Sequence, residues 1–285
     1  MPKLMVRYGE LGLKSPPVRK RFENALTEDI RRRHLLARVP CVISSTRGRV
    51  FVDSDDWRKS CEILSRTFGV VSYSPVSEAD SGLESLTRAV LVFSEPLLYP
   101  GATFAVRTRR TGSHPYTSKT LAEHLGKEIL GKFRDMGIRV SLDEPDVEIN
   151  VEVRDNMAYL FSSVLAGPGG MPSGTQGRLL SVVSSERGIA SSWLMMKRGC
   201  TTIIAADDED IVSPLNAWCP GLRTLRTPQD PFALAREQGC LGLAFELSLK
   251  DIEQGRALKG DLPVFYPLVG MTDDQVEALV SRIRS

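Results

Sequence analysis

Three arginines at the end of a candidate strand are the clearest candidates for binding chemistry in this sequence. Apolar and polar residues alternate over Thr103–Arg109, which predicts a strand with Arg107 and Arg109 on one face, and Arg110 opens the loop that follows. Guanidinium groups present paired donors that match phosphate oxygens, and Lys119 adds a cation at the start of a predicted helix. The group predicts contacts to nucleic-acid phosphates that position RNA without reading its sequence. The alternative is a solvated strand edge.

The start of the first predicted helix carries a second basic patch. Its members are Lys14, Arg19, Lys20 and Arg21. Cations there oppose the helix dipole, so helix stability does not explain them. Two interpretations of this patch stay open: it contacts RNA, or it is an ordinary solvated face of the helix. The triplet 31–33 near the end of the same helix needs no such explanation, because cations are favourable there. In the loop after the arginines, His114 and Tyr116 are candidates for stacking on a base, with packing on the surface as the alternative.

Several other chemistries find little support. The five cysteines are scattered and form no C-x-x-C pair, which argues against a disulfide scaffold or a zinc site and favours a reducing cytoplasm. The acidic run Asp207–Asp210 has no convergent partners and is typical of a solvated loop. Ser184, Ser185 and Ser191 lack a nearby His/Asp signature of a hydrolase.

Residues 1–75 must form the scaffold for the second patch. Strands are predicted at 4–8, 42–45, 49–52 and 70–74. Between them, Val18, Phe22, Leu26 and Ile30 mark the apolar face of one helix, which Ser15 caps ahead of two prolines, and residues 57–68 form another. The order β-α-β-β-α-β is typical of a ferredoxin-like domain.

The rest of the chain divides into two further patterns. Residues 76–165 predict helices at 83–93 and from Ser118, and paired strands at 147–153 and 158–164. A glycine-rich stretch at 167–177 is interpreted as a linker. Beyond it, strands at 179–183, 201–205, 222–226, 241–245 and 264–266 alternate with helices at 191–197, 231–238, 249–254 and 273–284, which indicates a doubly wound parallel sheet.

Charge is unevenly distributed along the chain. The formal net charge is +2, but residues 1–75 carry +7, residues 76–165 carry −3 and the remainder −2. A polyanion-facing surface at one end is therefore expected. The sequence contains no apolar run long enough to span a membrane. The N-terminal segment Met1–Tyr8 is too short and too charged for a secretory signal, so a cytoplasmic location is expected.

Four ordered segments resemble the tRNA 4-thiouridine synthetase (ThiI-like) family. They read RYGELGLKS at 7–15, VRTRRTGSHPYTS at 106–118, GGMPSGTQG at 169–177 and MMKRGC at 195–200, and LPVFYPLVGM at 262–271 is similar to the family's closing strand and turn. The resemblance implies an α/β chain with an N-terminal ferredoxin-like domain at 1–75 and a THUMP RNA-binding domain at 76–165. After a linker at 166–177, it implies a shortened Rossmann-like domain at 178–285, derived from a PP-loop ATP pyrophosphatase. It also implies recognition of tRNA and ATP-dependent replacement of an oxygen of uridine by sulfur.

The expected phosphate loop of that family is altered here. Family members carry S-G-G-x-D-S between a strand and a helix, where glycines let backbone N–H groups approach phosphates. The corresponding segment reads Ser184, Ser185, Glu186, Arg187, Gly188, so both glycines and the aspartate are missing. Glu186 would bring a carboxylate toward the phosphates, which disfavours binding.

These observations favour a tRNA-binding subunit of a thiolation system that lacks ATP pyrophosphatase activity. No catalytic residue, metal or cofactor is expected in this chain, with ATP and magnesium required only if a divergent site still binds them. The expected partner is tRNA, together with a separate catalytic or sulfur-donor protein, and a homodimer is possible by resemblance. Two alternatives stay open: an active sulfurtransferase with a divergent nucleotide site, and a scaffolding protein with no RNA role.

Overall fold

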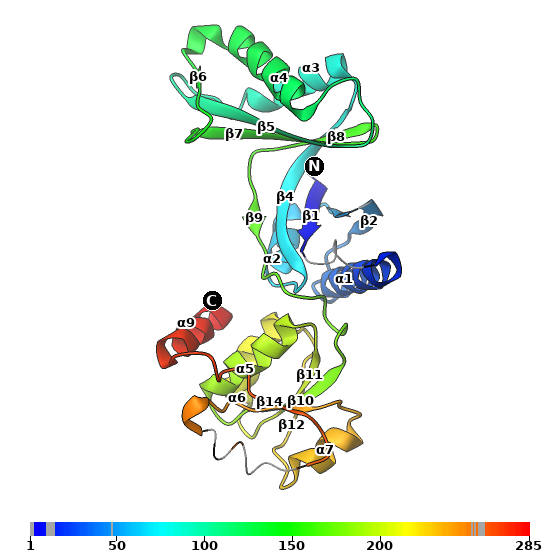
Figure 1. Cartoon of the computed structure of the whole chain (residues 1–285), viewed down its shortest axis with the longest axis vertical. Coiled ribbons are helices and arrows are strands. Elements are labelled where there is room, and N and C mark those ends of the chain that lie inside the picture. Colours follow the sequence, from blue (N-terminus) through cyan, green and yellow to red (C-terminus); the bar gives the residue numbers. More distant parts are fainter. Residues whose placement is uncertain (1–2, 10–14, 47, 252, 254, 256–259) are drawn as a thin grey trace. The chain divides into compact units, whose positions relative to one another are not determined.

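The computed structural model describes residues 3–9, 15–46, 48–251, 253, 255 and 260–285, and the statements below concern these residues. The chain forms two compact units (Figure 1). Unit 1 comprises residues 1–5, 51–57 and 73–165, and unit 2 comprises residues 6–50, 58–72 and 166–285. Because the expected domain bounds divide the chain in another way, those bounds stay a prediction.

The first elements follow the predicted ferredoxin-like order. They are β1 (Lys3–Tyr8), α1 (Pro16–Leu36), β2 (Val42–Thr46), β3 (Arg49–Asp53), α2 (Trp57–Ser65) and β4 (Val70–Asp80). Strands β1, β3 and β4 contribute residues to both units, and the hydrogen-bonded order of the first four strands is β2, β3, β1, β4. Helix α1 buries Phe22, Leu26 and Ile30 as predicted, whereas Val18 is 40% exposed.

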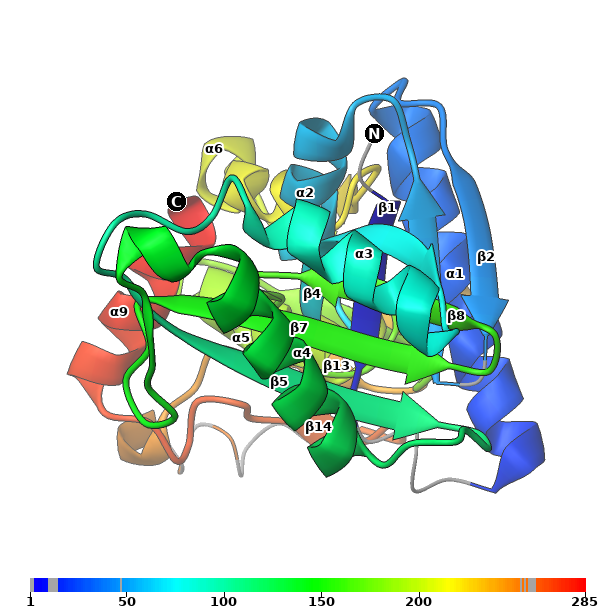
Figure 2. The same cartoon turned by 90° about the horizontal axis from the view of Figure 1, so that it is seen from above.

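Unit 1 is a sheet covered by two helices. Its elements are α3 (Leu83–Ser94), β5 (Thr103–Thr111), α4 (Ser118–Lys132), the 3₁₀ turn η2 (Arg134–Met136), β6 (Arg139–Val140), β7 (Val147–Arg154) and β8 (Met157–Phe161). The strand order is β4, β8, β7, β5, β6, with β5 parallel to β7 and β7 antiparallel to β8. Helices α3 and α4 lie along one face of this sheet (Figures 1 and 2). The core between them includes Leu86, Leu121, Leu125 and Ile149.

The C-terminal part of unit 2 is the predicted parallel sheet. After β9 (Leu165–Ala166) come β10 (Arg178–Val182), α5 (Glu186–Lys197), β11 (Thr201–Ala205), α6 (Glu209–Val212), the 3₁₀ turn η3 (Ser213–Ala217), β12 (Arg223–Leu225), α7 (Pro231–Glu237), β13 (Leu243–Ala244), the 3₁₀ turn η4 (Leu249–Asp251), β14 (Val264–Phe265) and α9 (Asp273–Arg284). All neighbours in the order β12, β11, β10, β13, β14 are parallel. This confirms the doubly wound arrangement. Where a helix is predicted at 249–254, the structure has η4, and residues 252 and 254 lie outside the described part.

Helices cover both faces of this sheet. Phe232 and Ala235 of α7 pack with Leu180 and Ile203 on one face. On the other, Ile189 and Trp193 of α5 and Ile283 of α9 pack with Ile204. The last helix begins where the sequence predicts, because Thr272 and Gln275 form a reciprocal capping box.

The glycine-rich stretch 167–177 is packed rather than free. The N–H of Met171 donates to the carbonyl of Lys197 at 2.9 Å, and the N–H of Gln176 donates to the carbonyl of Gly199 at 3.1 Å. Gly170 has a φ of +76°, and a Cβ there would lie 2.2 Å from the Lys197 oxygen. The third and fourth family-like segments therefore bind each other at the end of α5.

A buried ion pair joins α1 to the C-terminal part of unit 2. Arg33 is 4% exposed, its Nε donates to Asp29 at 2.9 Å, and its Nη2 donates to the carbonyl of Trp218 at 2.6 Å. The prediction that residues 31–33 form an ordinary solvated group is therefore wrong for Arg33. The charge is buried because a carboxylate and a carbonyl satisfy it.

Candidate functional site

The start of α5 lies at the carboxyl end of β10, the central strand of the parallel sheet. In doubly wound sheets, ligands bind beyond the carboxyl ends of the strands, where neighbouring connections run to opposite sides. Strand β10 lies at such a point, because its neighbours are β11 on one side and β13 on the other. The helix that follows β10 begins at Glu186, five residues before the predicted start at Ser191. Ser185 is its N-cap and accepts the N–H of Arg187 at 3.2 Å.

A carboxylate of the chain itself lies at this helix start. Glu246 follows β13 closely, and one of its oxygens accepts the hydroxyl of Ser184 at 2.6 Å. The other accepts the N–H of Ser184 at 3.3 Å and the N–H of Ser185 at 3.2 Å. The carboxylate therefore bonds the backbone donors at the positive end of the helix, where an anion is favoured.

Gly188 allows this close approach. A Cβ at that position would lie 2.4 Å from the nearer Glu246 oxygen and 2.9 Å from the Cα of Val183. The segment 184–188, predicted as an altered nucleotide loop, is thus built around an internal carboxylate. Sequence reading missed Glu246 because it is 61 residues away from Ser185.

Ion pairs surround the same helix start. Arg284 donates to Glu186 at 2.6 Å, and Asp273 accepts from Arg187 and from Lys250, each at 2.7 Å. Hydrogen bonds from Lys250 and Arg187 lower the pKa of Asp273. Both charged side chains of the segment, Glu186 and Arg187, are thus paired with residues of α9. The oxygens of a triphosphate at this helix start would compete with Glu246 for the same N–H donors.

The described residues contain no cluster of three or more His, Cys, Asp or Glu side chains that could hold a metal ion. In the run Asp207–Asp210, Asp208 caps α6 and Asp207 accepts the N–H of Thr227 at 3.2 Å. The acidic run is exposed as expected, but Glu209 and Asp210 begin helix α6, so only its first half lies in a loop.

None of the five cysteines is disposed as a nucleophile. All are free, and burial raises the pKa of every one, in the case of Cys61 to about 11. A sulfur carrier reacts as a thiolate, which needs the opposite environment. These thiols are thus protonated at neutral pH.

The arginines of β5 differ in how they are engaged. Arg107 pairs with Glu148 at 3.1 Å and donates to the carbonyl of Leu142. Arg110 donates to the carbonyl of Gly112 at 3.0 Å. The side chain of Arg109 is exposed and makes no hydrogen bond to a described residue, and the side chain of Lys119 is 85% exposed with Glu123 only at 4.0 Å. Arg109 and Lys119 are therefore the members of this group whose donors are most available.

Tyr116 belongs to the core of unit 1. It is 8% exposed, and its hydroxyl donates to the carbonyl of Ser81 at 2.6 Å. His114 stacks on it with ring centroids 5.5 Å apart and bonds the carbonyl of Thr111 at 3.1 Å. The packing alternative holds for Tyr116, because its ring is covered and its polar tip is satisfied.

The second basic patch is only partly visible. Arg19, Lys20 and Arg21 lie in the first turns of α1, where the N–H of Arg19 donates to the carbonyl of Ser15 at 2.8 Å, and their side chains make no hydrogen bond to a described residue. Lys14 lies outside the described residues. The RNA-binding role of both patches stays a prediction.

In the part of the chain that the structure describes, no helix is long and apolar enough to cross a membrane.

The fold and these segments define a chain built from a ferredoxin-like part, a helix-covered mixed sheet and a doubly wound parallel sheet. Residues 3–74 match the family model of the ThiI ferredoxin-like domain, and residues 81–163 match that of the THUMP domain. A probable tRNA sulfurtransferase of Methanothermobacter thermautotrophicus is 30% identical over 98% of this chain and 84% of its own length. The chain belongs to the ThiI-like tRNA sulfurtransferase family, as its motifs predict.

Other relatives match over a smaller share of their length. A probable tRNA sulfurtransferase of Moorella thermoacetica is 40% identical over 69% of this chain, which is 50% of that relative, and one of Methanobrevibacter smithii is 37% identical over 52% of its length. The chain thus spans about half the length of these two.

Solved structures match the whole chain. The crystal structure of PH1313 from Pyrococcus horikoshii has a TM-score of 0.86 and 28% identity, with 99% of both chains covered. The crystal structure of a 4-thiouridine synthetase–RNA complex with bound ATP has a TM-score of 0.78 and 20% identity, over 99% of this chain and 85% of that one. The second likeness bears on the fold alone.

Proposed function

We propose that this chain binds tRNA and acts in tRNA thio-modification as an RNA-binding subunit, without ATP pyrophosphatase activity of its own. The observation that carries the second part is the carboxylate of Glu246 on the N–H groups of Ser184 and Ser185. A phosphate would have to displace a ligand that is already attached to the protein and of the same charge. Adenylation of the base and supply of sulfur would then fall to a separate protein.

RNA binding is assigned to the THUMP domain and, within it, to Arg109 and Lys119. Their side chains are exposed and free of close ion pairs, so binding phosphate would not require breaking an internal bond. The match of residues 81–163 to the THUMP family model supports this assignment. Contacts of this kind favour RNA of the right shape over RNA of a given sequence.

Filter binding of bulk tRNA across a series of salt concentrations tests the RNA function. Affinity is expected to fall steeply with salt, and Arg109→Gln with Lys119→Gln should reduce the slope of log K against log salt by about one for each phosphate that the variant no longer binds. Lys127→Gln, on the exposed surface of α4, is the control for each single variant, because it also removes one positive charge and its side chain makes no hydrogen bond to a described residue. Association that lacks salt dependence, or an unchanged slope in the double variant, contradicts the assignment.

Titration calorimetry with ATP and magnesium, with and without tRNA, tests the catalytic part. The wild-type chain is expected to give no saturable binding of ATP in either case. Saturable binding that requires tRNA would favour an active sulfurtransferase with a divergent nucleotide site.

A further inference from the structure

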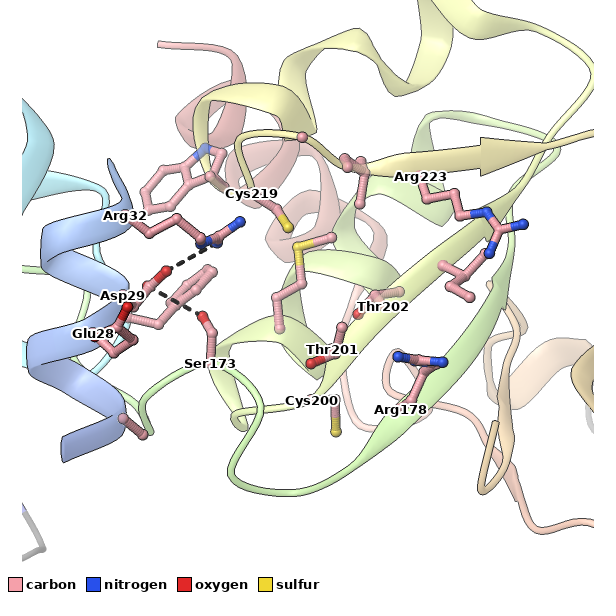
Figure 3. Close-up of a pocket in the computed structure, with 17 residues that line it drawn as sticks. Glu28, Asp29, Arg32, Ser173, Arg178, Cys200, Thr201, Thr202, Cys219 and Arg223 are labelled. Atoms are coloured by element: carbon pink, nitrogen blue, oxygen red, sulfur yellow. Dashed lines mark hydrogen bonds and ion pairs between the residues drawn. The ribbon is translucent and has the colours of Figure 1, made fainter. Parts of the chain in front are cut away.

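A cavity of about 450 Å³ lies in unit 2 at the amino-terminal ends of β10, β11 and β12 (Figure 3). It is at the edge of the parallel sheet opposite to the start of α5, so it is separate from the site around Glu246. Its walls come from these strands and from α1, which contributes Asp29 and Arg32. Its volume is within the range of about 300–1,000 Å³ for small-molecule sites.

The cavity exists because neighbouring strands begin at different levels. Strand β11 begins at Thr201, but its pairing with β12 begins only at Ile203, which is opposite Arg223. The first two residues of β11 therefore have no neighbouring strand on that side. In-register partners of a parallel sheet share a face, so Arg178, Thr201 and Arg223 project from the face that α7 covers, and Thr202 projects from the opposite face.

Two arginines of the cavity lack carboxylate partners. Arg178 donates to the carbonyl of Gln238 at 3.0 Å, and the side chain of Arg223 makes no hydrogen bond to a described residue; neither side chain belongs to an ion pair of the described chain. Arg32 differs, because it donates to Asp29 at 3.0 Å (Figure 3). The acidic residues of the wall are also engaged: Asp29 bonds Arg32 and Arg33, and Glu28 bonds Arg31. The free guanidinium groups therefore favour an anion.

A buried hydroxyl on the cavity wall is unsatisfied. Thr202 is 4% exposed, and its Oγ1 has no hydrogen-bond partner among the described groups. Nearly all buried polar atoms in proteins are hydrogen-bonded, and one that is not carries a free-energy cost that a bound polar ligand can remove. The hydroxyl thus provides a second, independent indication of a ligand.

The remaining wall limits what the ligand can be. Phe68 and Trp218 stack on each other with centroids 5.6 Å apart, so each has one ring face covered by the other. Burial raises the pKa of Cys200 and of Cys219, which also line the cavity, so both stay neutral thiols. The wall offers apolar contact and hydrogen bonding, and it offers no nucleophile.

We propose that this cavity binds a phosphate-bearing ligand of mononucleotide size. The phosphate is held by Arg178 and Arg223 on one face of β11, and the body of the ligand passes the unpaired edge of that strand to reach the Thr202 hydroxyl on the other face. The same chemistry is offered by a free nucleotide and by the terminal nucleotide of an RNA chain. The proposal does not depend on the role of Glu246 or on the arginines of β5.

Titration calorimetry tests the site with AMP and, separately, with a short single-stranded RNA that carries a 5′-phosphate. Arg178→Gln with Arg223→Gln should weaken binding by at least about tenfold, because two charge-assisted hydrogen-bonding groups are removed. Thr202→Val keeps the shape of the side chain and should weaken binding several-fold without loss of folding. Arg226→Gln is the matched control, since Arg226 follows β12 outside the cavity.

The two probes distinguish the sources of the phosphate. AMP binding that depends on Arg178, Arg223 and Thr202 supports a free nucleotide, and RNA binding with the same dependence but no AMP binding supports an RNA end. Binding that is equal in all variants places the ligand elsewhere and overturns the proposal, as does the absence of binding by both probes. Arg109→Gln with Lys119→Gln should leave AMP binding unchanged, so failure here is separable from failure of tRNA binding.

Discussion

Replacing Glu246 should both destabilise unit 2 and uncover an anion site. Its carboxylate accepts three hydrogen bonds at 2.6, 3.2 and 3.3 Å, two of them from backbone N–H groups at the start of α5. Loss of a side-chain acceptor at a helix start costs about 1 kcal/mol, and loss of a charge there adds a few tenths to about 1 kcal/mol. Ser184 is exposed, so water can replace part of this stabilisation. We expect a decrease of about 1 kcal/mol for Glu246→Gln and about 1–2 kcal/mol for Glu246→Ala.

Urea unfolding followed by tryptophan fluorescence measures this change. Trp193 and Trp218 lie in the core of unit 2, so they report on the unit that contains the contact. Glu277→Gln is the control, because Glu277 is an exposed residue of α9 that bonds no described group, and such substitutions usually change stability by less than about 0.5 kcal/mol.

Anion binding provides the second readout. ATP or inorganic phosphate should stabilise Glu246→Gln against urea while leaving the wild-type protein unchanged, because a ligand that binds the folded state raises its stability. If Glu246→Gln unfolds at the wild-type urea concentration and gains no stabilisation from phosphate, the carboxylate does not act at the helix start. Equal stabilisation of both proteins by ATP would refute the loss of the nucleotide site.

Three further predictions concern unit 2. Burial lowers the pKa of His34 below its ordinary 6.5, so the unfolded chain binds more protons than the folded chain near that pH. The free energy of unfolding should therefore fall as the pH drops from about 7 to 5. Urea unfolding measured at each pH should show a flatter dependence for His34→Gln. Arg33→Met leaves Asp29 buried with one fewer partner and should cost about 3 kcal/mol in the same assay, whereas Arg31→Met, at an exposed pair, should cost less than about 1 kcal/mol. Gly170→Ala places a Cβ at a positive φ and against the Lys197 oxygen, so it should lower the free energy of unfolding by about 2 kcal/mol or more. Gly221 also has a positive φ, +78°, but a Cβ there has open space, so Gly221→Ala should lower it by only about 1 kcal/mol. Thermal unfolding compares the two variants.

Elements with strong local signals could be predicted from the sequence, and elements defined by distant partners could not. Strand β11 and helix α9 have the predicted bounds, because alternation and a capping box are local features. The early start of α5 was missed because Ser185–Gly188 offers no apolar periodicity, and this segment is fixed by Glu246. Strand β4 extends to Asp80 because Ser77–Asp80 pairs with β8, although three of these four residues are polar.

The candidate sites follow the same division. The exposure of Arg109 agrees with what its place in an alternating strand indicates, whereas the pairing of Arg107 depends on Glu148, 41 residues further along. Tyr116 sits in a loop sequence typical of a surface, but its ring completes the core below α3 and α4. The burial of Arg33 depends on the Trp218 carbonyl, 185 residues away, and no local pattern reveals it.

The division of unit 2 into distant segments has a consequence for folding during synthesis. Residues 6–50 and 58–72 leave the ribosome well before residues 166–285, with the whole of 73–165 between them. Until Trp218 has emerged, Arg33 has no carbonyl to receive its donor and Phe68 lacks the tryptophans that cover it. We expect segment 73–165 to form its local contacts first, because closing a long loop is slow and entropically costly. Residues 6–50 and 58–72 therefore keep apolar surface exposed until residues 166–285 are synthesised. We expect this part of the nascent chain to depend most on chaperones.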